Sequence, residues 1–225
     1  MKYLLDTINI KTIEKAIEYL PVSGVTSNPS IVKKEGNIQF FEHMKQIRQI
    51  IGKEQSLHIQ VTAADAAGML KEAEALLAKI DKEVYIKVPV HRVGLRVIKA
   101  LKAQGIHVTA TAIYTTHQGL LAMEAGADFI APYYNRMENM NLNPEETIST
   151  FAQMIECYGY STQVVAASFK NIGQVNKAFR AGAQAATVDP LLLESALEMP
   201  AIAQAVDDFS RDWQSIYGGR LIADL

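Results

Sequence analysis

A single lysine, Lys87, lies within the apolar segment Val84–Val90. Such a segment is typical of a buried strand, and burial of an ammonium group without a partner lowers the pKa of the amine. A lysine that is neutral near physiological pH is a nucleophile that attacks a carbonyl carbon and forms a Schiff base. The alternative is a lysine on an edge strand, whose ammonium group reaches solvent. Taken by itself, the segment favours this alternative.

Further polar side chains recur where other apolar segments end. Each has an ordinary structural explanation, such as helix capping by Asp6 and Ser168, or a Ser-Asn-Pro turn around Thr26 and Asn28. Gathered around a lysine with a perturbed pKa, they match the pattern expected of an active site. The residues are Asp6, Thr26, Asn28, Gln60, Thr109, Thr111, Tyr133, Asn135, Arg136, Ser168 and Lys170.

The residue types suggest how protons would move. An imine at Lys87 would act as an electron sink, so that an adjacent carbon–carbon bond could break. Asp6 would relay protons or stabilise charge near the amine. Tyr133, Gln60 and Thr111 would hold and activate a water molecule, and Tyr133 is the best acid/base candidate of the three.

The remaining residues suggest how a substrate would bind. Arg136 and Ser168 would form a phosphate site, because a guanidinium group matches phosphate oxygens and the next helix begins with free amides. Lys170 would add charge there, and Asn28 would bind a substrate hydroxyl. The predicted substrate-binding set is Thr26, Asn28, Thr109, Asn135, Arg136, Ser168 and Lys170.

The elements that carry these residues alternate regularly. Apolar runs predict strands at Lys2–Asp6, Gly24–Thr26, Leu57–Val61, Val84–Val88, His107–Ile113, Asp128–Pro132, Gln163–Ala167 and Ala185–Asp189. Amphipathic stretches predict helices at about Ile10–Tyr19, Phe40–Ile51, Ala64–Ile80, Leu95–Gln104, Thr116–Ala125, Pro144–Tyr158, Ile172–Ala181, Leu191–Glu198 and Ala201–Tyr217. Loops are expected before Phe40 and after Pro132.

Strict alternation predicts parallel strands with crossover helices, and eight units that close predict a (β/α)8 TIM barrel with one extra C-terminal helix. The active site would lie at the carboxyl ends of the strands. A doubly wound sheet is disfavoured, because no glycine-rich turn follows Leu5-Asp6. No linker or low-complexity segment interrupts the chain, which favours one domain over residues 1–225.

Bulk properties exclude several other classes of protein. The formal net charge of −2 gives no basic surface for nucleic acid. Cys157 is the only cysteine, which excludes an intramolecular disulfide and a cysteine-based metal cluster. The sequence contains no run of about 18 apolar residues, which is the length that a membrane helix requires, so a cytoplasmic protein is expected.

His58 and His107 should both face the barrel interior. Two inward histidines could bind a metal or could simply be part of the core, and the core interpretation is favoured.

Five ordered segments resemble the small transaldolase-like proteins, in particular the fructose-6-phosphate aldolase branch. The resemblance extends from Met1 to the helix that contains Trp213, and it implies a Schiff-base lysine at Lys87, with Asp6, Thr26, Asn28, Thr111, Arg136 and Ser168 in the site. It also implies a cofactor-free enzyme that forms homo-oligomeric rings, pentamers or decamers, in which the C-terminal helix packs across subunits. The segments are Leu5–Thr7, Gly24–Ser30, Ile86–Val90, Ala131–Arg136 and Ala166–Lys170.

Two positions distinguish the activities within this resemblance. Transaldolases usually carry a glutamate on the third strand and Pro-Phe on the sixth, whereas this chain has Gln60 and Pro132-Tyr133, which is similar to the aldolase branch. The leading expectation is a class I aldolase that splits fructose 6-phosphate into dihydroxyacetone and glyceraldehyde 3-phosphate. The alternatives are a transaldolase that transfers the dihydroxyacetone unit, and a non-catalytic barrel that binds sugar phosphates.

Some features leave the substrate and the assembly open. His91, Arg92, Asp189 and the stretch Asn139–Pro144 depart from the family pattern. The aromatic residues of the last helix repeat every four positions, so they could face a neighbouring subunit or cover the chain's own barrel. They are Phe209, Trp213 and Tyr217.

Overall fold

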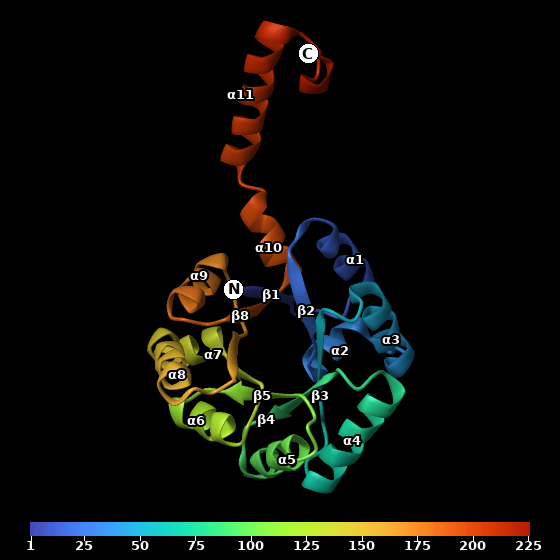
Figure 1. Ribbon diagram of the computed structural model, residues 1–225, viewed down its shortest axis with the longest axis vertical. Coiled ribbons are helices and arrows are strands. Elements are labelled where there is room, and N and C mark those ends of the chain that lie inside the picture. Colours follow the sequence, from blue (N-terminus) through green and yellow to red (C-terminus); the bar gives the residue numbers. More distant parts are fainter. The chain divides into compact units, whose positions relative to one another are not determined.

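The computed structural model describes all 225 residues of the chain. Eight parallel strands pair in chain order, and the last pairs with the first, so they close into a barrel that helices surround (Figure 1). The strands are β1 Lys2–Leu5, β2 Val22–Thr26, β3 Ser56–Gln60, β4 Tyr85–Pro89, β5 Val108–Ile113, β6 Phe129–Pro132, β7 Gln163–Ala166 and β8 Ala185–Val188. The predicted (β/α)8 barrel is confirmed.

The predicted crossover helices are present, with ends that differ by a few residues. They are α1 Ile10–Tyr19, α3 Phe40–Ile51, α4 Ala66–Lys79, α5 Arg92–Lys102, α6 Thr116–Glu124, α8 Pro144–Tyr158, α9 Ile172–Arg180 and α10 Pro190–Leu197. The largest difference is at α5, which begins three residues before the predicted Leu95. Its N-cap is His91, whose ring nitrogen Nδ1 accepts a hydrogen bond from the Val93 amide at 3.3 Å.

Two helices replace predicted loops. Helix α2, Pro29–Glu35, begins after Asn28, whose side chain accepts hydrogen bonds from the Ser30 and Ile31 amides. Asparagine at the N-cap followed by proline at the first helical position is a helix-start signal as well as a turn signal. Helix α7, Tyr134–Asn139, has no side-chain cap and is too short for a period to show in the sequence. The predicted loop after Pro132 is therefore wrong.

The chain divides into two compact units, Met1–Pro190 with the barrel and Leu191–Leu225. The second unit contains α11, Pro200–Tyr217, and a short 3-10 helix at Ile222–Asp224. No residue of α11 is buried, and its Trp213 ring lies 4.6 Å from the Tyr217 ring. No helix of the structure combines the length and the apolar character that a membrane span requires.

Within the barrel, alternate residues of each strand face inward. The lower interior is packed by an apolar cluster of Leu4, Phe129, Ala131, Val165 and Ala185, against which Tyr85 lies. Helix α5 approaches the end of β4 closely at Gly94, where a Cβ atom would lie 1.9 Å from the Pro89 carbonyl oxygen. Only glycine permits this approach, which fixes the strand that carries Lys87 against its helix.

Candidate active site

Lys87 lies on the inner wall of the barrel, in register with Gln60 on β3 and Thr109 on β5. Its side chain is buried, with 5% of its surface exposed, and its Nζ donates a hydrogen bond to the Ser27 carbonyl oxygen at 2.7 Å. Burial lowers the pKa of the amine, and the charge of Asp6 opposes this shift only in part. A closed barrel has no edge strand, so the interpretation of Lys87 as an edge lysine is wrong.

Asp6 follows β1 and is fixed by two threonines. Thr26 Oγ1 donates to Asp6 Oδ1 at 2.7 Å and lies 2.6 Å from Thr187 Oγ1, which must therefore be the donor in that second contact. Asp6 does not cap α1, because Asn9 does so. Burial raises the pKa of Asp6, although the charge of Lys87 lowers it. Asp6 and Lys87 form no ion pair, and burial favours the neutral form of both.

Tyr133 and Thr111 meet above this pair. Their hydroxyl oxygens lie 3.1 Å apart. β5 carries a bulge between Ala110 and Ile113, and Ala112 takes a left-handed φ of 58°, which re-aims the end of the strand toward β6. Burial raises the pKa of Tyr133, while Thr111 and Arg136 lower it, so the phenol holds its proton at neutral pH. Gln60 contributes a buried Oε1 that has no hydrogen-bond partner within the chain.

A cationic group stands at the mouth near Tyr133. Arg136 is exposed, its guanidinium carbon lies 4.8 Å from the centre of the Tyr133 ring, and its Nη1 donates to the Tyr114 hydroxyl at 3.1 Å. No ion pair of the chain involves Arg136. Its other N–H donors are therefore available for an anion.

The loop after β7 lies next to this cation. The Asn135 amide donates to the Ser168 carbonyl oxygen at 2.9 Å, which joins the two loops. Ser168 takes a left-handed φ of 65°, a conformation that usually belongs to glycine. Lys170 is exposed beside it. Ser168 does not cap α9, because Asn171 accepts the hydrogen bond from the Gln174 amide.

Two predicted binding residues also have structural partners. The Oδ1 of Asn28 caps α2, which leaves its Nδ2 as the group that could face a substrate. The Oδ1 of Asn135 accepts a hydrogen bond from Gln174 Nε2 at 3.1 Å. Both side chains therefore combine a structural contact with a remaining amide group.

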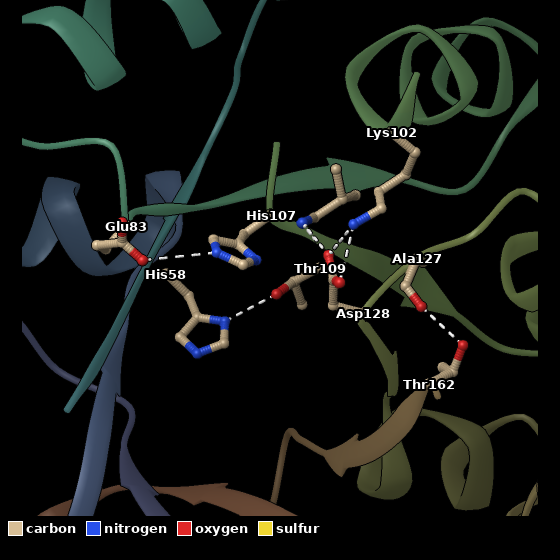
Figure 2. A network of polar contacts seen from close by, with 9 residues as sticks. His58, Glu83, Lys102, His107, Thr109, Ala127, Asp128 and Thr162 are labelled. Carbon is tan, nitrogen blue, oxygen red and sulfur yellow. Dashed lines mark hydrogen bonds and ion pairs between the residues drawn. The ribbon is translucent and has the colours of Figure 1, made fainter. Parts of the chain in front are cut away.

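Thr109 is in register with Lys87, but its hydroxyl points to a buried partner in the interior rather than to the mouth. Its Oγ1 lies 2.7 Å from Nδ1 of the fully buried His58, as Figure 2 shows. The other ring nitrogen of His58 lies 2.8 Å from Ser56 Oγ. With both nitrogens bonded to hydroxyls, His58 is arranged as a core histidine and not as a metal ligand.

His107 comes just before β5, and its ring stacks on Tyr85 with ring centres 4.7 Å apart. Its Nε2 lies 3.6 Å from Glu83 Oε2, a contact that Figure 2 shows. Tyr85 in turn stacks on His58 at 4.6 Å. Three stacked rings therefore form the floor beneath Lys87, and no three His, Cys, Asp or Glu side chains gather as metal ligands.

Sequence reasoning missed three contributors to the site. Thr187 lies on β8, two residues before Asp189, where the predicted eighth strand ends, so the two-residue period of a strand could have indicated it. Tyr114 follows β5 directly, but nothing in its neighbourhood indicates a contact with Arg136. Gln174, which bridges Asn135 and the Lys170 amide, carries no signal beyond its place in a helix.

Comparison with known proteins places this arrangement in a family. The chain matches the transaldolase/fructose-6-phosphate aldolase family model over residues 3–219. It is 51% identical over 222 residues to a probable fructose-6-phosphate aldolase of Streptococcus pneumoniae, with 99% of this chain and 100% of that protein covered. It is 37% identical over 213 residues to a probable transaldolase of Geobacillus kaustophilus, with 95% and 98% covered. A probable transaldolase of Agathobacter rectalis is 33% identical over 218 residues, with 97% and 100% covered. The chain belongs to the transaldolase/fructose-6-phosphate aldolase family of enzymes.

Proposed function

We propose that the protein is a class I aldolase that reversibly cleaves fructose 6-phosphate into dihydroxyacetone and glyceraldehyde 3-phosphate. The observation that carries the proposal is the buried amine of Lys87, which faces the interior of a closed barrel and forms no ion pair. A desolvated amine of this kind is neutral more often than an exposed one, and it is then a nucleophile toward a ketone.

The reaction would begin when the amine of Lys87 adds to the C2 carbonyl of the sugar. Loss of water gives an iminium ion, and its positive charge draws the electron pair of the C3–C4 bond. As that bond breaks, the C4 hydroxyl loses its proton and glyceraldehyde 3-phosphate leaves. The resulting enamine is protonated at C3, and water releases dihydroxyacetone and the free amine.

The groups around Lys87 suit these proton transfers. Tyr133 keeps its proton at neutral pH and is bonded to Thr111, so it can give a proton to the enamine directly or through a water molecule. The charge of Asp6, when its carboxyl group is ionised, raises the pKa of the Lys87 amine and so opposes the effect of burial. Arg136 and Lys170 would bind the phosphate of the sugar at the mouth.

Gln60 favours aldolase over transaldolase activity. The amide of Gln60 cannot serve as a general base. Its buried Oε1 can instead orient a water molecule, and that water can protonate the enamine. The name of the Streptococcus pneumoniae relative supports the same choice. A transaldolase would instead keep the enamine until a second aldehyde arrived, and the relatives with that name make it the second candidate.

Borohydride reduction in the presence of dihydroxyacetone tests the imine. Mass spectrometry should find the adduct on the peptide with Lys87, and the Lys87→Met variant should lose it. Lys99→Met, which changes a lysine of α5 outside the site, is the matched control. An adduct that survives in Lys87→Met would refute the mechanism, and binding without any adduct would favour a non-catalytic barrel.

A kinetic comparison then separates the two activities. Cleavage of fructose 6-phosphate is measured with and without erythrose 4-phosphate as acceptor. The aldolase proposal expects free dihydroxyacetone at a similar rate in both cases. Transfer that greatly exceeds cleavage would make the protein a transaldolase.

We also propose a homo-oligomeric ring, a pentamer or decamer, in the cytoplasm. The support is α11, which has no buried residue and exposes 70% of Phe209 and 72% of Ile216. Such a surface is usually covered by a partner, and a second copy fits a symmetric ring. Sedimentation of the full chain and of Phe209→Ser tests the assembly: a monomeric wild-type protein would refute it. Cell fractionation tests the location.

A further inference from the structure

Two tyrosines hold the guanidinium group of Arg136 in one place. The Tyr114 hydroxyl accepts a hydrogen bond from Arg136 Nη1 at 3.1 Å, and the Tyr133 ring lies under the guanidinium carbon at 4.8 Å. The two rings pack edge to face, with centres 5.6 Å apart and planes at 71°. An exposed arginine is usually mobile, so this double contact restrains it in a defined position.

Tyr114 is itself fixed to the strand that carries Lys87. The amides of Tyr114 and Thr115 donate to Gln118 Oε1 at 3.0 and 3.2 Å. The Nε2 of the same Gln118 donates to the Val90 carbonyl oxygen at 3.0 Å, just beyond the end of β4. The backbone of Tyr114 is therefore anchored to the end of the strand that bears the reactive amine, and its ring packs against Tyr133.

The consequence concerns how an anion would bind. Ordering a long side chain at a binding site costs roughly 0.5–1.5 kcal/mol, which corresponds to about two- to twelvefold in affinity. An arginine that is already restrained avoids much of this loss. The remaining N–H donors of Arg136 have no acidic partner in the chain, so they are left for the anion.

We propose that Tyr114 is a positioning residue that prearranges Arg136 for the anionic group of the substrate, and thereby selects phosphorylated over uncharged aldehydes. The inference rests on the proposed function, since it concerns the aldehyde that this site accepts. A purely structural role is the competing explanation, in which Tyr114 only joins the loops after β5 and β6. The two explanations predict different effects of removing the Tyr114 hydroxyl.

Tyr114→Phe removes the hydroxyl and keeps the ring. Calorimetric titration with inorganic phosphate should show roughly three- to tenfold weaker binding than in the wild type. In aldol addition to dihydroxyacetone, the ratio of kcat/KM for glyceraldehyde 3-phosphate to that for glyceraldehyde should fall by a similar factor. The loss should appear in the KM of the phosphorylated aldehyde rather than in kcat.

Tyr160→Phe is the matched control. It removes another tyrosine hydroxyl that has a side-chain partner, Glu124, outside the site. Its phosphate affinity and its aldehyde ratio should equal those of the wild type. Tyr133→Phe is a second comparison: the ring under Arg136 remains, so phosphate affinity should persist while turnover falls.

Several outcomes would overturn the inference. One is a Tyr114→Phe variant that binds phosphate as the wild type does. Another is an equal loss with both aldehydes together with a lower melting temperature, which would indicate a structural role. Phosphate titration needs no turnover, so it separates this inference from the proposed function. If Tyr114→Phe binds phosphate more weakly but the wild-type protein does not cleave fructose 6-phosphate, the proposed function is refuted and this inference still holds for the anion site.

Discussion

Lowering the pH from about 7.5 to about 5.5 should destabilise this protein through His58, and replacing His58 by Phe should remove that effect. The Ser56 hydroxyl donates to the Ser23 carbonyl oxygen, so toward His58 it can only accept, from Nε2–H. Nδ1 is then the acceptor for the Thr109 hydroxyl. The contacts therefore fit a neutral ring with one defined tautomer.

The charges around His58 oppose its protonation. Burial lowers its pKa well below the usual 6.5, and the charges of Lys87, Arg48 and His107 lower it further. In the unfolded chain the same ring binds a proton as the pH falls below 6.5, whereas in the folded protein it stays neutral. The unfolded state then holds more protons, so the free energy of unfolding decreases as the pH falls through this window.

The size of the loss of stability follows from the number of protons that His58 binds in the unfolded chain. Between about pH 7.5 and 5.5, a histidine with an unfolded pKa of about 6.5 gains nearly one proton, which stabilises the unfolded chain by about 1.4 kcal/mol. This is a tenfold change in the folding equilibrium constant. It is a noticeable fraction of the roughly 5–15 kcal/mol that stabilise a typical protein.

Urea unfolding at several pH values measures the effect. His58→Phe keeps a ring against Tyr85 but loses both hydrogen bonds, so it should be less stable than the wild type at pH 7.5. The difference between the two proteins should shrink by about 1.4 kcal/mol at pH 5.5. His117→Gln, a change at an exposed histidine, should follow the wild-type curve. Parallel curves for the wild type and His58→Phe would refute the reasoning.

Three further predictions concern Lys87, Asp6 and Gly94. Lys87→Met should abolish borohydride trapping and raise the free energy of unfolding by about 1–3 kcal/mol in urea titrations, because a desolvated amine is replaced by an apolar side chain. Asp6→Asn removes the charge that raises the pKa of Lys87, so the pH midpoint of imine trapping should move to a lower value. Gly94→Ala should destabilise the protein by about 3 kcal/mol or more in thermal or urea unfolding, because the new Cβ would collide with the Pro89 carbonyl oxygen. Gly219→Ala is the control: its new Cβ would meet no atom within 4 Å, so the change should have little effect.

The architecture could be predicted because it follows from a local pattern. Each strand of a barrel is apolar and each crossover helix has one apolar face, so alternation alone indicates the fold. Helix α2 was missed because Asn28-Pro29 starts helices and turns alike. Helix α7 has only six residues, which is less than two turns and too few to show a period.

The candidate site could be predicted in part, for a similar reason. Lys87 stood out because its neighbours are apolar, and Thr111 was found from the two-residue period of a strand. The contact between Tyr114 and Arg136 joins residues 22 positions apart, so it depends on how neighbouring loops meet. The hydroxyl of Thr109 points to a partner two strands away on β3, which no local pattern in β5 could indicate.

Ser168 shows how selection for heat resistance would act on this protein. A residue other than glycine in the left-handed region costs about 1–2 kcal/mol, so Ser168→Gly relieves strain at no steric cost. A laboratory screen that rewards only survival of heating would enrich this substitution. It would at the same time delete the side chain of a residue that the sequence predicts to be part of the phosphate site. Engineering of a more durable catalyst should therefore keep Ser168 fixed and look for stabilising changes elsewhere in the barrel.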